Sequence, residues 1–372
     1  MPPARPSLPA HARTLIAVLA DPGQAGALTL DAWDLLIRTA RVARLLGVLQ
    51  AVLEGAGRFD AVPEPVRAHL VAGRRQAEYR RQMALYEADC VASVLAPAGI
   101  STVLLKGAAY AALGLRCAVG RMPEDLDILV PRARLAEAEE LLRDAGWALE
   151  EKDDYDERYY REWSHELPPL RFPGHAFELD LHHAIVPPIA RHPVDMALVL
   201  SACRPLPGDG RFLVLSPADQ VLHAALHLFQ DECVDRLRDL VDLWFLLEEL
   251  GARPGFWDDL VGRAGALPAG RPLWYALQCL EALVGWRPPA AVSAAVDRFA
   301  PPRPAAWTML RLLATCLPPL HPDAHGDRGR WVARQALLAR ALWLRFPVPI
   351  LARHLAMKGI RSLRGKPAPA AP

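Results

Sequence analysis

The order of elements in residues 102–130 constrains the fold more than any other feature of this chain. Residues 102–105 and 126–130 are apolar and partly β-branched, which predicts two short strands. The alanine-rich residues 108–115 predict a helix between them. The local order is therefore strand, turn, helix and strand, with charged side chains at both junctions.

The second strand opens with two aspartates, Asp125 and Asp127, that are separated by one apolar residue. Side chains two positions apart along a strand share a face, so these carboxylates converge. Carboxylates held close together repel unless a proton or a cation lies between them, and their hard oxygen ligands suit Mg²⁺ or Mn²⁺. A third carboxylate from a neighbouring strand would complete a two-metal clamp of the kind used in phosphoryl transfer. The simpler alternative is that an isolated D-x-D caps a turn.

Residues 175–185 supply the third carboxylate in this interpretation. Their sequence, HAFELDLHHAI, alternates between apolar residues and the polar residues Glu178, Asp180 and His182. Asp180 is therefore expected on the polar face of a strand. His182 shares that face, where it could orient Asp180 or meet substrate, or could serve as a structural histidine.

The turn at Lys106 and Gly107 predicts an anion site. Lysine is rare here, since arginine supplies most of the 43 cationic side chains. Backbone N–H groups and the helix dipole favour an anion where a strand gives way to a helix, and glycine lets a phosphate come close. Lys106 could then neutralise a triphosphate oxygen, with Arg121 as a second phosphate ligand or as a partner that holds the aspartates. An exposed lysine at an ordinary tight turn is the structural alternative.

Three segments together resemble a known family. The segments LLKGAAYAALG, RMPEDLDILV and FELDLHHAI resemble the uncharacterised bacterial nucleotidyltransferase family of the DNA polymerase beta superfamily. Its members show an L-K-G segment, an R-x-x-x-D-x-D strand and a later E/D-x-H strand. The similarity extends from about Trp33 to Leu250 and is densest between residues 103 and 183.

The resemblance implies a mixed β-sheet with helices on it and metal-dependent transfer of a nucleotidyl group. It places Lys106 and Gly107 at the phosphate turn, Asp125 and Asp127 as metal ligands, and Asp180 as the third acid.

Two departures from the family pattern concern Ala108 and Glu124. Ala108 follows Gly107 where the superfamily often has a serine after a glycine, so a hydroxyl contact to phosphate is missing. Glu124 adds a carboxylate beside the aspartate pair, either as a solvated neighbour or as a group that alters metal affinity.

The remainder of the chain predicts helices around this core. Apolar residues recur at helical spacing over residues 28–96, and helices are expected over 132–145, 217–229, 235–250, 272–285, 305–316 and 330–344. The charged residues 150–161 predict an exposed loop. The expected fold is α+β, a polymerase-beta-like nucleotidyltransferase core flanked by helical regions. Its predicted divisions are residues 1–97, 98–190 and 191–365, with a loose tail over 366–372; residues 1–12 are also expected to be loose.

Later helices contain further candidates. Asp242 interrupts an apolar run, where a buried charge needs a partner, and Arg238 one turn earlier is available. The family also has an aspartate on a comparable helix, so this helix could close over the nucleotide. His223 and His227 have the spacing of a zinc-binding helix, but core histidines are the better interpretation because no glutamate follows His223.

Composition excludes several classes of protein. A formal charge of +1 argues against a nucleic-acid coat, and six scattered cysteines without a C-x-x-C pair argue against disulfide frameworks and zinc ribbons. No apolar run is long enough for a transmembrane helix or a signal peptide, so a cytoplasmic protein is expected. Residues 328–364 combine arginines with apolar residues, and could form a helix pair with a basic outer face or a contact with an acidic partner or membrane surface.

The predicted function is transfer of an NMP group from an NTP to an acceptor that the sequence does not identify: a protein, a peptide, a small molecule or RNA. Transfer of another phosphorylated or sugar group by the same site is one alternative. A non-catalytic nucleotide-binding or scaffold protein is the other. Repulsion within the aspartate pair also predicts that replacing Asp125 or Asp127 by asparagine abolishes transfer without lowering stability.

Overall fold

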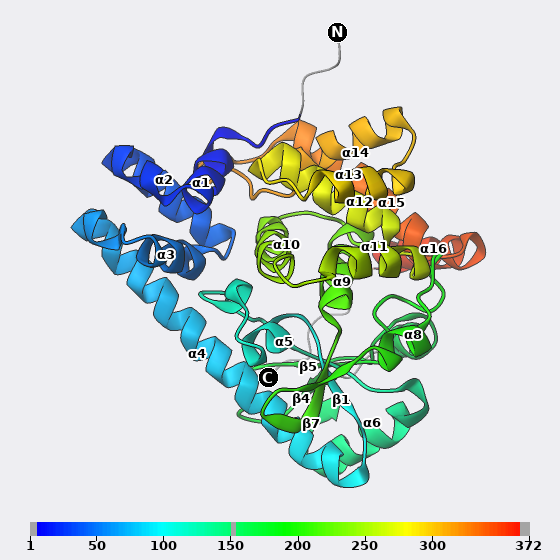
Figure 1. Cartoon of the computed structure of the whole chain (residues 1–372). Helices are drawn as coiled ribbons and strands as arrows, with labels where there is room; N and C mark the ends of the chain where they lie inside the picture. Colours follow the sequence, from blue (N-terminus) through cyan, green and yellow to red (C-terminus); the bar gives the residue numbers. More distant parts are fainter. Residues whose placement is uncertain (1–5, 150–153, 365–372) are drawn as a thin grey trace.

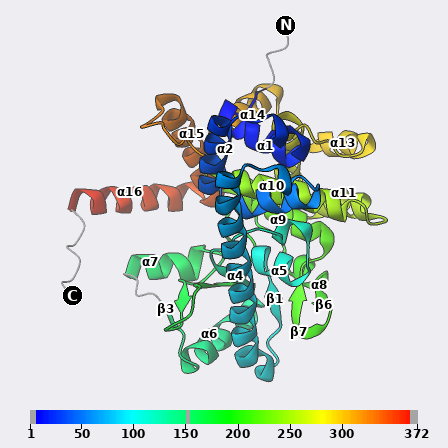
Figure 2. The ribbon, with the colours of Figure 1, turned by 90° about the vertical axis from the view of Figure 1, so that its left-hand side faces the viewer.

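The computed structural model describes residues 6–149 and 154–364, with side chains described through residue 357. A mixed sheet with its helices forms one end of the molecule and the C-terminal helices form the other (Figure 1). The long helix α4 (Glu64–Leu95) runs from the N-terminal helices along the sheet part (Figures 1 and 2). The predicted tail over residues 366–372 lies outside the described residues.

The N-terminal region is helical, as its apolar spacing predicts. Before α4 come α1 (Ala10–Ala20), α2 (Leu30–Val42) and α3 (Leu46–Gly55). The Thr29 hydroxyl caps α2 by accepting a hydrogen bond from the N–H of Ala32. The prediction that residues 1–12 are loose is wrong for those that the structure describes from Ala10 onward, because α1 buries His11 and Ala12.

The described residues form a seven-stranded sheet in the order β3-β4-β5-β2-β1-β7-β6. The strands are β1 (Thr102–Leu104), β2 (Leu126–Leu129), β3 (Ala148–Leu149), β4 (Leu170–Arg171), β5 (Leu179–His182), β6 (Arg204–Leu206) and β7 (Asp209–Val214). The central strand β2 pairs antiparallel with β1 and parallel with β5. The sheet is therefore mixed, and its middle strands are those that carry the acidic residues.

Short helices surround the sheet. They are α5 (Lys106–Ala112), α6 (Leu135–Asp144), α7 (Asp154–Arg158) and α8 (Met196–Ser201). A π-helical turn, Tyr159–Trp163, continues α7 and buries Trp163. The prediction of an exposed loop over 150–161 is therefore wrong from residue 154 onward, since aromatic side chains within the charged stretch anchor a helix; residues 150–153 lie outside the described residues.

The C-terminal region is helical as predicted. It contains α9 (Pro217–Gln230), α10 (Leu237–Leu250), α11 (Phe256–Ala266), α12 (Gly270–Cys279), α13 (Ala290–Val296), α14 (Arg303–Cys316), α15 (Arg328–Arg345) and α16 (Val348–Arg364). The Ser216 side chain caps α9, with Pro217 in the first turn. One hydrophobic cluster extends from Leu8 to Leu337, so helices from both ends of the chain share a core.

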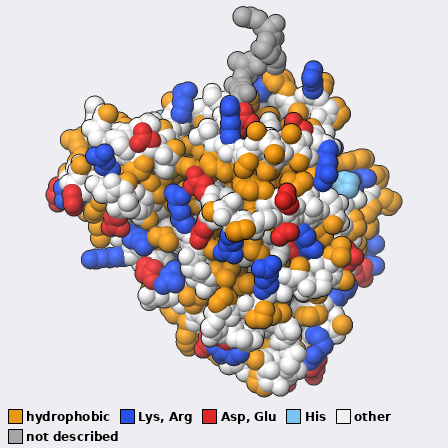
Figure 3. All heavy atoms as spheres, viewed as in Figure 1, with side chains coloured by type: hydrophobic (Ala, Val, Ile, Leu, Met, Phe, Trp, Pro, Cys, Tyr) orange, Lys and Arg blue, Asp and Glu red, His pale blue; other side chains and the backbone are white. Residues whose placement is uncertain are grey.

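The surface and the ends of the fold agree with the balanced charge. Acidic and basic side chains are interspersed on the face seen in Figure 3.

All six cysteines are free. Helix α15 buries Ala333, Leu337 and Ala341, whereas α16 projects from the body (Figure 2). Among the described residues, no helix is long and apolar enough to cross a membrane.

Candidate functional site

The parallel pairing of β2 with β5 brings the predicted acidic residues together. Asp127 lies opposite Asp180 in the register of these two strands, so both side chains leave the sheet on the same face. Asp125 precedes β2 by one residue. All three aspartates line a cavity of about 340 Å³, together with Lys106.

Asp127 accepts hydrogen bonds from two side chains of this site. Its Oδ1 accepts hydrogen bonds from Lys106 Nζ at 2.7 Å and from His182 Nε2 at 2.9 Å. Asp127 is only 4% exposed. Burial alone would raise its pKa, but Lys106 and His182 hold the pKa well below its usual range. Lys106, predicted to stand ready for a phosphate, is therefore an ion-pair partner of Asp127 in this structure.

Lys106 also has an unusual backbone. Its φ of 41° lies in the left-handed region, which costs a non-glycine residue about 1–3 kcal/mol. The N–H of Leu105 donates to the Asp127 carbonyl at 3.2 Å and fastens this turn to β2. The predicted helix over 108–115 in fact begins at Lys106. A strained backbone persists only where the surrounding contacts enforce it, and such strained residues are typical of functional sites.

Gly107 makes room for the side chain of Arg121. A Cβ atom at Gly107 would lie 2.3 Å from Arg121 Nη1. Arg121 Nε in turn donates to Asp242 Oδ2 at 2.8 Å, and both side chains are buried. The sequence offers Arg238 as an available partner of Asp242, but Arg121, brought close by the fold, is the residue that donates this hydrogen bond. Burial raises the pKa of Asp242, and Arg121 opposes that rise.

Arg238 lies instead at a cluster around Glu124. Its Nη1 is 3.4 Å from Glu124 Oε2, and Arg44 also contacts that carboxylate. Glu124, the extra carboxylate beside the aspartate pair, is therefore an ion-pair partner of Arg44 and Arg238. A small cavity of about 100 Å³ lies between the two groups. Basic and acidic side chains both line it, among them Lys106, Arg236, Arg238, Asp125, Asp127, Asp239 and Asp242.

A residue of the long helix supports the start of β2. Arg80 Nε donates to the Pro123 carbonyl at 2.6 Å, and its guanidinium lies over the Phe177 ring at 4.6 Å. Arg80 fixes the backbone just before Asp125.

The three aspartates suit a divalent metal chemically. Desolvation by the surrounding walls, followed by repulsion from Asp127, raises the pKa of Asp125, although its side chain reaches solvent. Burial and the charges of Asp127 and Glu166 raise the pKa of Asp180 to about 7. A set of oxygen donors that resists full ionisation is one that a hard cation such as Mg²⁺ or Mn²⁺ would stabilise.

The sequence interpretation missed two residues of the cavity, His165 and Glu166. They lie between Trp163 and β4, and both line the cavity with the aspartates. Glu166 Oε2 is 3.4 Å from His182 Nε2. The signal in the sequence is a His-Glu pair shortly after the charged stretch, in a segment with no strand or helix periodicity of its own.

The two histidines of α9 differ in their position relative to this group. His223 is buried, and burial lowers its pKa to about 3. His227 lines both cavities. Among the described residues, neither belongs to a cluster that could hold a metal.

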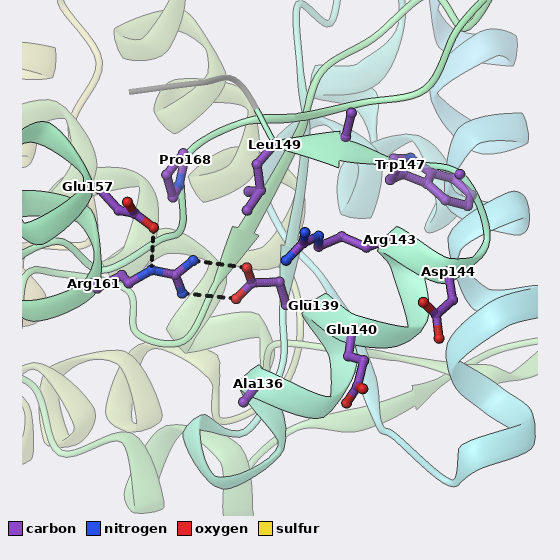
Figure 4. Close-up of a pocket in the computed structure, with 12 residues that line it drawn as sticks. Ala136, Glu139, Glu140, Arg143, Asp144, Trp147, Leu149, Glu157, Arg161 and Pro168 are labelled. Atoms are coloured by element: carbon purple, nitrogen blue, oxygen red, sulfur yellow. Dashed lines mark hydrogen bonds and ion pairs between the residues drawn. The ribbon is translucent and has the colours of Figure 1, made fainter. Parts of the chain in front are cut away.

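A larger hollow, of about 1110 Å³, lies away from the aspartates (Figure 4). Arg161 points across it to Glu139, to which it donates two hydrogen bonds of 3.0 Å, and it also donates to Glu157. These charges satisfy one another. The smaller cavity, with its converging acids, is therefore the candidate site.

Residues 30–285 match the model of a family described as uncharacterised nucleotidyltransferase. The match includes every aspartate of the cavity and also Lys106, His165 and Glu166. The chain matches no curated protein and no solved structure.

Proposed function

We propose that this chain, which belongs to the uncharacterised nucleotidyltransferase family, is a metal-dependent nucleotidyltransferase with a polymerase-beta-like core. It would move an NMP group from an NTP to an acceptor. One observation carries the proposal: the register that sets Asp127 beside Asp180, with Asp125 and Lys106 lining the same cavity. Converging carboxylates beside a cation are the arrangement that phosphoryl-transfer chemistry uses.

Asp125, Asp127 and Asp180 would hold the metal, Mg²⁺ or Mn²⁺. When bound, the metal would supply positive charge to neutralise the phosphate oxygens and lower the pKa of the attacking group. His182 orients Asp127 through the bond from Nε2 to Oδ1. The strands therefore position the acids before any ligand arrives.

Lys106 and the Gly107 turn would bind the phosphates. Lys106 lines both the aspartate cavity and the smaller cavity that Arg236 and Arg238 line. A polyphosphate bridging the two would meet three cations. The buried pair of Arg121 with Asp242 then serves to hold the turn and helix α10 together, rather than to touch phosphate.

Two alternatives stay open. The same site could transfer another phosphorylated or sugar group, and the acceptor could be a protein, a peptide, a small molecule or RNA. A nucleotide-binding scaffold without catalysis is disfavoured, because such a protein has no use for three carboxylates that line one cavity. The cytoplasmic location, the contact through the basic C-terminal segment and the division at residues 97, 190 and 365 remain predictions.

The test is transfer of label from α-labelled NTPs into the components of a lysate, with Mg²⁺ and with EDTA. We expect labelled product with Mg²⁺, none with EDTA, and none from the Asp125→Asn variant. Melting curves with NTP and Mg²⁺ run alongside; at a hundredfold excess over Kd, binding stabilises the protein by about 2.7 kcal/mol. Lys106→Ala is expected to lose most of that shift. No transfer by the wild type, combined with equal shifts in both proteins, would exclude the proposal.

A further inference from the structure

His165, Glu166 and His182 form a second group of potential metal ligands in the aspartate cavity. One nitrogen of each imidazole and one oxygen of Glu166 all lie within 4.8 Å of one another. His165 and Glu166 come from the segment before β4, and His182 from the end of β5. Two separate parts of the chain thus meet at one point.

Backbone hydrogen bonds hold these two parts together. The N–H of His183 donates to the His165 carbonyl at 2.9 Å, and the N–H of Leu167 donates to the Leu181 carbonyl at 3.0 Å. Glu166 and His182 form an antiparallel bridge between these contacts. The main chain therefore fixes the three residues without help from their side chains.

The side-chain distances are those of a coordination shell rather than of hydrogen bonds. Glu166 Oε2 lies 3.4 Å from His182 Nε2 and 3.6 Å from His165 Nε2. Hydrogen bonds of this type are shorter, about 2.7–3.2 Å. Ligands at about 2.0–2.1 Å from a tetrahedral zinc ion lie about 3.3 Å apart.

One nitrogen of each imidazole is without a hydrogen-bond partner among the described residues. The Nδ1 atoms of His165 and His182 are both buried, and neither finds a hydrogen-bond partner in the described part of the chain. No second hydrogen bond therefore fixes the tautomer of either ring. His182 Nε2, which lies 3.4 Å from Glu166 Oε2, hydrogen-bonds Asp127 Oδ1 at 2.9 Å. A metal bound through this nitrogen would replace that hydrogen bond and leave Asp127 beside the ion.

We propose that His165, Glu166 and His182 bind a divalent transition metal, with Zn²⁺ as the best match, beside the carboxylate site. Imidazole nitrogen favours zinc and its neighbours, whereas Mg²⁺ prefers an all-oxygen set such as the three aspartates. Two histidines and a glutamate are a known zinc set that leaves one position open. The cavity would thus hold two sites with different metal preferences.

The test uses the full-length protein, stripped with EDTA and dialysed, without nucleotide. Zn²⁺ is titrated against a chromogenic chelator in the presence of excess Mg²⁺, and Co²⁺ is added separately to record its visible spectrum. We expect one Zn²⁺ per chain that Mg²⁺ does not displace, and cobalt bands of a low-coordinate nitrogen and oxygen site. His165→Gln and Glu166→Gln should each weaken Zn²⁺ binding at least tenfold, whereas the exposed His192→Gln should not.

Several results would overturn the proposal. They are no Zn²⁺ uptake by the wild type, wild-type affinity in Glu166→Gln, and a thiolate-to-cobalt band, which would assign the ion to a cysteine. Circular dichroism checks that each variant is folded. If His165→Gln does not fold, Glu166→Gln alone decides the test, because this change is nearly isosteric and the residue is partly exposed. Because no nucleotide is present, the outcome is separable from the proposed transferase activity: either site can fail while the other stands.

Discussion

The ammonium of Lys106 lies 2.7 Å from Asp127 Oδ1, and this ion pair changes what the two aspartates of β2 are expected to contribute to stability. Asp127 is buried and paired, whereas Asp125 reaches solvent and has its pKa raised by desolvation and by Asp127. The two residues that the sequence treats as equivalent are therefore in opposite electrostatic situations.

Asp125→Asn and Asp127→Asn should consequently have different effects on thermal stability. Asp127→Asn leaves the Lys106 charge without its partner, which costs about 3–5 kcal/mol for a buried pair. Asp125→Asn removes a repelling charge and should melt at or above the wild-type temperature. The expectation from sequence that either change spares stability is thus revised for Asp127.

Thermal melting of the metal-free variants measures this difference in stability. Adding Lys106→Met to Asp127→Asn is the control, since removal of both charges should recover most of the loss. Equal melting temperatures for the two single variants would show that the ion pair contributes nothing.

Asp180→Asn should lower turnover more than nucleotide binding. Asp180 comes from β5, whereas the phosphate-binding turn precedes α5, so its loss leaves Lys106 and Gly107 in place. We expect the NTP-induced melting shift to stay near that of the wild type while transfer falls at least a hundredfold, as for removal of a group that stabilises developing charge. If the NTP-induced melting shift and the transfer activity fell together, Asp180 would belong to the nucleotide-binding site instead.

The sequence predicts local structure around the site well. The apolar strands, the alanine-rich helix and the D-x-D spacing each depend on neighbours a few residues apart, and β1, α5 and β2 follow them. The alternation around Asp180 likewise predicts β5. That β2 and β5 pair, that they run parallel, and that Asp127 lies opposite Asp180 are facts of the fold, which neither segment shows by itself.

Partners far apart in sequence could not be predicted in the same way. Arg121 and Asp242 meet only because α10 packs beside the turn that follows α5. Arg238 is nearer to Asp242 in sequence, yet its side chain turns toward Glu124. His165 and Glu166 depend on backbone bonds to β5, which no periodicity in their own segment reveals.

Gly107→Ala should destabilise the protein through Arg121. The added methyl carbon would lie 2.3 Å from Arg121 Nη1, so the guanidinium must leave Asp242 or the turn must move. Breaking a buried ion pair costs about 3–5 kcal/mol. Gly262→Ala, in α11 with open space around it, is the matched control and should be neutral or stabilising by up to about 1 kcal/mol. Denaturant melts compare the two, and equal effects would contradict the role assigned to Gly107.

His223 should make the fold sensitive to acid. Burial lowers its pKa to about 3, against 6.5 for an unperturbed histidine. Between these values the unfolded chain binds a proton that the folded chain does not, so the free energy of unfolding falls as pH drops below about 6.5. One such group accounts for about 2 kcal/mol between pH 6.5 and 5. His223→Gln should show a shallower slope over this range in urea melts, and a slope equal to that of the wild type would remove His223 as the cause.

The last prediction concerns the exposed side of α15. Trp331 and Val332 are 63% and 60% exposed there, and residues 328–364 contain nine cationic side chains and no acidic one. Aromatic and cationic side chains together favour the surface of an anionic bilayer. We expect the protein to sediment with phosphatidylserine vesicles and not with pure phosphatidylcholine vesicles.

Replacing both exposed side chains in Trp331→Ala/Val332→Ala should weaken this partitioning about tenfold or more, because burial of one such side chain is worth about 1.5–3 kcal/mol. Trp307→Ala, on α14 and 38% exposed, is the control and should sediment like the wild type. High salt should release the protein, since the attraction of its arginines for the anionic surface is screened. Sedimentation that ignores lipid charge, or that survives the double substitution, would mean that α15 and its basic neighbours serve the fold alone.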